Sequence, residues 1–238
     1  MKSDVISLRR FEWRIRQRGY HYEYEEDIFK NKIIPKCNKT PDFYVQSIDN
    51  LAFLVEVESF EKKTVLHTKK SHVMSLSHMV LQKRINRAVR NAADQLKPYA
   101  DLGLSLVIVL DNHRQVGLSL EYRELVSLFG EQYFTFKIDS VTGNQVDQPV
   151  FEHQDDGSPF ASGERSYISA VLVNEPGCRF DNFKTEDDFT IERPMRARII
   201  HHPGAAIPLA FSAFQTTVDE HIVYRDKHWQ KFGGTERI

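Results

Sequence analysis

Residues 40–45, Thr-Pro-Asp-Phe-Tyr-Val, and residues 51–58, Leu-Ala-Phe-Leu-Val-Glu-Val-Glu, decide how the fold of this chain is interpreted. Both segments are rich in the aromatic and β-branched residues that favour strands. Asp49 and Asn50 lie between them, and these residue types are typical of turns. The sequence therefore predicts a β-hairpin in this region.

Three carboxylates belong to this hairpin. Residues two apart on a strand point to the same face, so Glu56 and Glu58 would share a face, and the antiparallel neighbour would bring Asp42 beside them. Such a group of hard oxygen ligands is costly to hold together unless a divalent cation neutralises it. We expect Mg²⁺ here, with Mn²⁺ as an alternative, in a site that polarises a phosphate and activates water. The simpler alternative is that Asp42 caps a turn and the two glutamates face solvent on an edge strand.

The composition is that of a globular protein. With 238 residues and 41% hydrophobic content, the chain can bury a sizeable core, as one large domain or as a catalytic domain with a second lobe. No apolar run approaches the roughly 20 residues that a membrane helix needs, and the first residues hold no signal-peptide core. Cys37 and Cys178 fit no zinc or redox spacing. We expect a soluble cytoplasmic protein with reduced cysteines.

The first half alternates helical and strand-like patterns. Apolar residues recur at helical intervals over residues 5–18 and 75–99, residues 20–24 alternate as in a short strand, and residues 104–110 form an almost continuous apolar run. The order strand, helix, strand favours a parallel crossover with the last strand buried on both faces. We expect an α/β fold with layers of helix, sheet and helix.

The second half is broken by Gly and Asp turns into short pieces. Strands are expected at residues 133–138, 168–173 and 197–202, a helix around 208–214, and a frayed end from residue 232. We therefore divide the chain into a core of residues 1–125 and a β-rich extension of residues 126–238, which packs on the core or continues it.

The charges are unevenly distributed although the formal net charge is only −1. Between Lys62 and Lys97, nine basic residues face the single acid Asp94. This stretch would attract a polyanion, or it would be an ordinary solvated surface. Arg87 and Asn91 precede Gln95 at intervals of four, which places a polar stripe on one helix face.

Other site types find no support in the sequence. No serine lies in a nucleophile-elbow context and no Gly-rich phosphate loop is present, which argues against a serine hydrolase and a nucleoside triphosphatase. The histidines, including the adjacent His201 and His202, lack metal-ligand spacing. We interpret them as ordinary polar residues.

The hairpin and the helix that follows it together resemble a known family. Pro41-Asp42, thirteen intervening residues and Glu56-Val57-Glu58 are similar to the PD-(D/E)XK signature of restriction endonucleases and related nucleases. Gln95-Leu96-Lys97-Pro98-Tyr99 resembles the Gln-x-x-x-Tyr motif of RecB-like members. The resemblance covers roughly residues 5–112. It implies a restriction-endonuclease-like α/β/α core with a mixed central sheet.

The resemblance also implies an activity, a metal-dependent nuclease acting on DNA. Asp42 and Glu56 would be metal ligands, Gln95 would orient the metal-bound water or a phosphate, and Tyr99 would contact DNA or brace the site. Glu12 would match the acidic residue of the first helix and would also bind metal. The alternatives for that last role are Glu23, Glu25 and Glu26.

Glu58 stands where the family has lysine. A second metal ion held by the added carboxylate would replace the missing positive charge, or Lys97 or Lys62 would supply it. The alternative function is a catalytically degenerate nuclease fold that binds nucleic acid or a partner protein. We expect DNA as the partner, and a homodimer or a larger defence, restriction or repair complex as the assembly. The residues expected to contact DNA are Tyr99, Lys97, Arg87, Asn91, Lys62 and Lys63.

Overall fold

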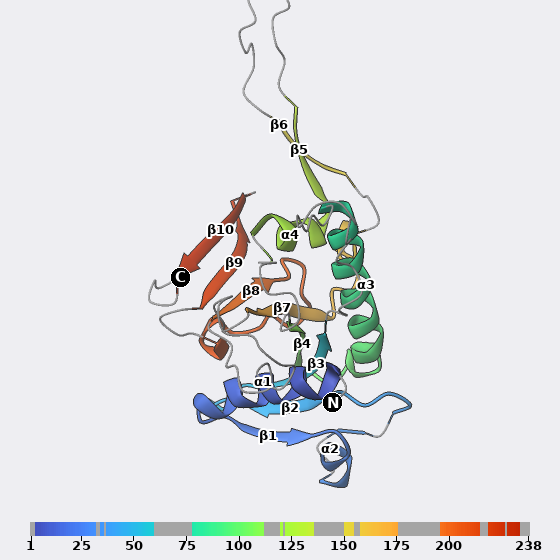
Figure 1. The fold of residues 1–238 in the computed structure, drawn as a ribbon, viewed down its shortest axis with the longest axis vertical. Coiled ribbons are helices and arrows are strands. Elements are labelled where there is room, and N and C mark those ends of the chain that lie inside the picture. Colours follow the sequence, from blue (N-terminus) through green and yellow to red (C-terminus); the bar gives the residue numbers. More distant parts are fainter. Residues whose placement is uncertain are drawn as a thin grey trace, which may run out of the picture.

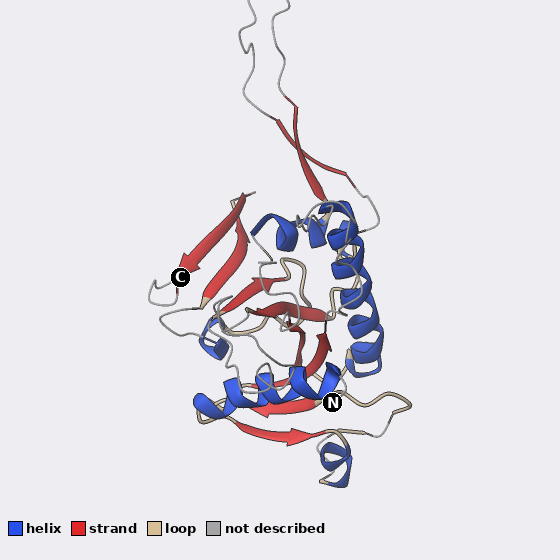
Figure 2. Cartoon of the chain, viewed as in Figure 1, coloured by secondary structure: helices blue, strands red, loops and turns tan. Residues whose placement is uncertain are grey.

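The computed structural model shows a mixed α/β protein built on a central eight-stranded sheet (Figure 1). It describes residues 3–31, 34–35, 37–59, 78–111, 120, 122–135, 150–154, 158–175, 196–214, 219–226 and 228–233. A separate two-stranded ladder, β5 and β6, stands apart from the sheet (Figure 2). In this part of the chain, no helix is long and apolar enough to cross a membrane.

Helices and strands alternate in the first half of the chain, whereas the second half contains mostly strands. The helices are α1 (Ser3–Gln17), α2 (Glu26–Lys30), α3 (His78–Leu96) and α4 (Tyr122–Val126), with 3-10 turns η1 (Lys97–Tyr99), η2 (Ser127–Phe129), η3 (Ala161–Gly163) and η6 (Phe211–Phe214). The strands are β1 (His21–Tyr24), β2 (Phe43–Gln46), β3 (Ala52–Ser59), β4 (Ser105–Asp111), β5 (Glu131–Thr135), β6 (Val150–Gln154), β7 (Ile168–Asn174), β8 (Ala197–His201), β9 (Glu220–Arg225) and β10 (His228–Gly233).

The sheet has the strand order β1-β2-β3-β4-β7-β8-β9-β10. The predicted hairpin is confirmed, because β2 and β3 pair antiparallel with Phe43 opposite Val55. The predicted parallel crossover is also confirmed, because α3 lies between the parallel strands β3 and β4. Every residue of β4 and β7 is buried, which is what an apolar strand at the centre of a sheet requires.

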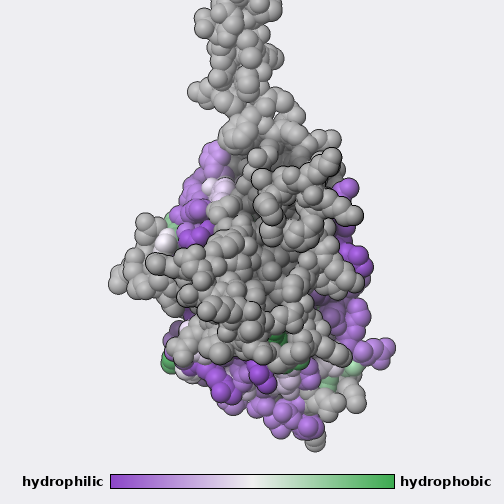
Figure 3. Space-filling model, in the orientation of Figure 1, coloured by the Kyte–Doolittle hydropathy of each residue, from purple (hydrophilic) through white to green (hydrophobic). Residues whose placement is uncertain are grey.

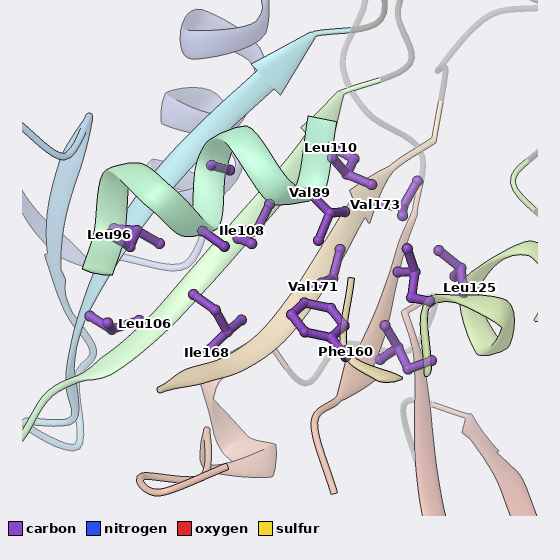
Figure 4. Close-up of a cluster of buried hydrophobic side chains, with 14 of the residues drawn as sticks. Val89, Leu96, Leu106, Ile108, Leu110, Leu125, Phe160, Ile168, Val171 and Val173 are labelled. Atoms are coloured by element: carbon purple, nitrogen blue, oxygen red, sulfur yellow. The ribbon is translucent and has the colours of Figure 1, made fainter. Parts of the chain in front are cut away.

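The two faces of the sheet are covered by different helices. Leu106 and Ile108 of β4 belong to the core cluster that contains Val89 and Leu96 of α3 (Figure 4). The intervening Val107 packs with Phe11 of α1 in a second cluster. This alternation puts α3 on one face of the sheet and α1 on the other, so even-numbered residues of β3 and β4 point toward α3.

Buried ion pairs and a hydrogen bond join α1 to β4, to β7 and to the residue that precedes β9. The Nε of Arg10 donates to the Asp111 carboxylate at 2.9 Å, and the Nε of Arg14 donates to the Oδ1 of Asn174 at 2.8 Å. Arg14 also reaches Asp219 at 3.1 Å. Both predicted parts of the chain therefore contribute strands to one sheet, with α1 bonded across it.

The outer strands are held partly by histidines. The Nε2 of His201 on β8 lies 2.9 Å from the Nδ1 of His221 on β9, and both rings are buried. Burial is the main cause that lowers the pKa of His201 to about 3 and that of His221 to about 4. Both imidazoles are consequently neutral at physiological pH.

Several details of the second half differ from the expectations. Residues 211–214 form a 3-10 turn rather than a regular helix, and the strand expected at 133–138 begins at Glu131. Phe232 and Gly233, expected to fray, pair in β10 with His221 and Glu220. The predicted fraying of residues 234 and 235 lies outside the described residues.

Candidate functional site

The predicted carboxylate site lies where β2 begins and β3 nears its end. Because Phe43 pairs with Val55, the next position outward places Asp42 beside Glu56. The backbone amide of Val57 donates to the Oδ2 of Asp42 at 2.7 Å. That bond fixes the Asp42 side chain against β3.

Glu56 is the most enclosed carboxylate of the site. Its side chain points toward α3, and only 4% of the residue is exposed. The Nε2 of Gln95 donates to its Oε1, whereas its Oε2 is buried and has no hydrogen-bond partner among the residues that the structure describes. A buried carboxylate oxygen without a donor is costly, so this atom is where a ligand or a proton would be accommodated.

The surroundings of Glu56 disfavour its ionised form. Burial and the negative charges of Asp42 and Glu58 raise the pKa of Glu56 to about 10, against smaller opposing effects from the Asp42 backbone amide and the Lys39 cation. Glu56 therefore carries a proton at neutral pH when no cation is bound. The charges of Asp42 and Glu58 thus both act on Glu56.

Gln95 and Tyr99 approach this site from the end of α3. Gln95 donates a hydrogen bond to Glu56, whereas the role that the family motif implies for it is to orient metal-bound water or a phosphate. The Tyr99 side chain is fully buried, and its hydroxyl donates to the backbone carbonyl of Lys39. The two roles predicted for Tyr99 are contact with DNA and bracing of the site. Its hydrogen bond to Lys39 holds the segment that leads into Asp42, which suits the bracing role.

Lys39 is the site residue that sequence reasoning missed. Its side chain is exposed, its Nζ donates to the Asp94 carbonyl at 2.9 Å, and its charge opposes the raised pKa of Glu56. Only its position, three residues before Asp42, was available as a signal in the sequence. Of the predicted replacements, Lys97 is exposed on η1, and Lys62 lies outside the described residues.

The donor atoms suit a divalent cation in kind, because Asp42, Glu56 and Glu58 offer only carboxylate oxygens, and no described residue bonds the Oε2 of Glu56. Within the described ranges, no group of three or more His, Cys, Asp or Glu side chains is arranged to hold a metal ion. Asp42 and Glu56 are the pair fixed by hydrogen bonds. Glu58 is half-buried and has its own interactions.

No protein-family model, curated protein or solved structure matches this chain.

Glu12 lies in a different environment. It is on α1, across the sheet from the Glu56 side chain, and its Oε1 accepts a hydrogen bond from the Tyr22 hydroxyl at 2.5 Å and pairs with Arg16 at 2.7 Å. Among its alternatives, Glu23 lies 3.4 Å from His21, and Glu25 acts on the Tyr24 hydroxyl. The side chain of Glu26 is outside the described part of the chain.

The residues predicted to contact DNA are only partly described. Arg87, Asn91 and Lys97 are exposed on α3 and η1, where a large ligand would reach them. Lys62 and Lys63 lie outside the described residues. The polar stripe toward Gln95 is thus present, since Arg87 and Asn91 lie on the turns of α3 that precede it.

Proposed function

We propose that this protein is a Mg²⁺-dependent deoxyribonuclease with a restriction-endonuclease-like core, acting in the cytoplasm. The single observation that carries the proposal is Glu56: a buried carboxyl beside Asp42, with one oxygen bonded to Gln95 and the other without a hydrogen-bond partner in the described part of the chain. A carboxyl group in such a place destabilises the folded chain at neutral pH. That cost is explained if the proton on Glu56 is exchanged for a divalent cation during function.

Each residue of the site would have its own role in binding the cation. Mg²⁺, when bound, would polarise the scissile phosphate and lower the pKa of an attacking water. Asp42 and Glu56 would hold the cation, and Gln95 would keep Glu56 in one rotamer so that its second oxygen faces the ligand. Glu58 would add negative charge near the cation.

Lys39 supplies the positive charge that Glu58 does not. An ammonium group near the phosphate stabilises the charge that develops on its oxygens as water attacks. Tyr99 holds the backbone of Lys39 through the hydrogen bond to its carbonyl. We therefore assign Lys39 the electrostatic role that the family gives to the lysine of its signature.

The test is cleavage of DNA in the presence of Mg²⁺ or Mn²⁺. Asp42→Asn and Glu56→Gln keep size and hydrogen bonding but remove charge, and each is expected to lower the rate by at least about 100-fold. Glu164→Gln is the matched control, because its side chain is 63% exposed and lies on another element. Cleavage by either site variant at the wild-type rate would overturn the proposal.

A second candidate function is a degenerate nuclease fold that binds nucleic acid or a protein without cutting. Glu58 in the place of the family lysine favours it. Mn²⁺ binding that disappears in Asp42→Asn supports the enzyme. DNA binding by a wild-type protein that binds no Mn²⁺ supports the degenerate fold.

A further inference from the structure

Most of the described cations are engaged by acids. Arg10 pairs with Asp111, and Arg198 is bonded to both Glu175 and Glu220. The surface cations Arg16, Lys30, Arg165 and Arg196 also have acidic partners within 4.0 Å. Pairing is therefore common for lysine and arginine in this protein, even at exposed positions.

Four basic residues of α3 and η1 depart from this behaviour. They make no ion pair with any side chain that the structure describes, and we call them the α3 ridge. Its members are Lys83, Arg87, Arg90 and Lys97. Unpaired cations that lie together repel one another, so this surface is more favourable with a polyanion beside it.

The ridge runs along the outer side of α3. Lys83, Arg87 and Arg90 recur at intervals of four and three, so they lie on one strip of the helix, turned away from the core residues Ile85 and Val89. Hydrophilic surface is visible on the side of the molecule where α3 lies (Figures 1 and 3). The exposed Asp94 is the one acid on the described part of α3.

The ridge leads to the carboxylate site. From residue 83 to residue 97 a helix rises about 21 Å. Gln95, which donates to Glu56, lies on the last turn of α3, between Arg90 and Lys97. Lys39 donates to the carbonyl of the neighbouring Asp94, so one more cation lies where the ridge meets the site.

We propose that the α3 ridge binds the sugar–phosphate backbone of a nucleic acid strand and directs it to Glu56. The proposal rests on the proposed function, since it takes the carboxylate site as the place of cleavage. One strand carries a phosphate about every 3.4 Å along the helix axis, so a length of about 21 Å presents about six phosphates at fixed spacing. An acidic protein segment has no such regular spacing and would add carboxylates beside Glu56.

The effect is measurable in the salt dependence of binding. Each phosphate contact changes the slope of log K against log salt concentration by about 0.9 for duplex DNA and about 0.7 for a single strand. Lys83→Gln and Arg87→Gln should each reduce the slope by that amount. The size of the reduction, about 0.9 or about 0.7, also tells whether duplex or single-stranded DNA lies on the ridge.

The experiment is fluorescence anisotropy with labelled duplex and single-stranded DNA in EDTA, between about 50 and 200 mM NaCl. Arg9→Gln is the matched control, because Arg9 is an exposed arginine of α1 on the opposite face of the sheet and makes no ion pair with a described side chain. Its replacement removes the same charge. The expected result is a reduced slope for Lys83→Gln and Arg87→Gln, and the wild-type slope for Arg9→Gln.

Two results would overturn the assignment. One is a slope that is equal in wild type and both ridge variants, or that falls as much in Arg9→Gln. The other is binding of polyglutamate with the affinity found for DNA and the same dependence on the ridge. EDTA prevents metal-dependent cleavage, so the binding result is independent of the cleavage assay. If the wild-type protein does not cleave DNA, the proposed nuclease function is rejected. If the salt slope is unchanged in the ridge variants, the proposed binding of nucleic acid by the α3 ridge is rejected.

Discussion

Glu56→Gln should make the metal-free protein more stable. The folded wild-type protein binds a proton on Glu56 up to a pKa of about 10, whereas the unfolded chain releases it at about 4.5. Between these values the folded state holds one proton more than the unfolded state, so stability falls as pH rises. The stability associated with protonated Glu56 is complete below pH 4.5 and is lost progressively toward pH 10.

The magnitude follows from linkage. Each pH unit in this window costs about 1.4 kcal/mol, so at pH 7 the wild-type protein is less stable than Glu56→Gln by about 3 kcal/mol. The difference should grow by about 3 kcal/mol between pH 7 and pH 9. Glutamine preserves the acceptor for Gln95, so the bond from α3 is retained while the ionisable group is removed.

The assay is urea unfolding followed by circular dichroism in EDTA at pH 7, 8 and 9. Comparison of wild type with Glu56→Gln cancels the titration of groups that do not interact with Glu56, and the buried histidine pair is among these groups. Glu164→Gln, on an exposed side chain, should follow the wild-type curve. Parallel stability curves for wild type and Glu56→Gln would refute the reasoning.

Three further predictions follow from the same structure. Lys39→Met should lower the rate of DNA cleavage by about 100-fold while Mn²⁺ affinity, measured by calorimetry, is retained; an unchanged rate would remove Lys39 from the site. Asp111→Ala should leave the buried Arg10 guanidinium without its carboxylate and lower the free energy of unfolding in urea by about 3–5 kcal/mol; a loss below about 1 kcal/mol would show that the pair is unimportant. Stability should also fall as pH drops from 6.5 toward 4, by up to about 1.4 kcal/mol per pH unit for each of His201 and His221, because the unfolded imidazoles bind protons that the buried ones exclude. Thermal unfolding of His221→Phe should show a weaker acid dependence than wild type, and an equal dependence would contradict this explanation.

The first half of the fold was predictable because its signals are local. Strand composition on both sides of Asp49 and Asn50 is enough to specify a hairpin, and an apolar run such as residues 104–110 is enough to specify a buried strand. The approach of Gln95 to Glu56 was predictable from the family motif. The raised pKa of Glu56 was not, since it depends on burial that only the packed helix α3 provides.

The second half depends on contacts between residues far apart in the chain. Nothing local to Asp111 indicates that it pairs with Arg10, 101 residues away, or that β7 lies next to β4. The β9–β10 hairpin was missed although Asp226, a residue type that is typical of turns, lies between the two strands and adopts a positive φ of 52°. Lys39 was missed because its place near Glu56 depends on a contact between distant residues, the bond from the Tyr99 hydroxyl to its carbonyl.

Calorimetric titration of the protein with Mn²⁺ near neutral pH, repeated in two buffers of different ionisation enthalpy, tests the central claim most directly. If Glu56 exchanges its proton for a divalent cation, Mn²⁺ binds the wild-type protein with release of about one proton per ion, and both signals disappear in Asp42→Asn. Absence of Mn²⁺ binding, binding without proton release, or equal binding in Asp42→Asn would contradict the account.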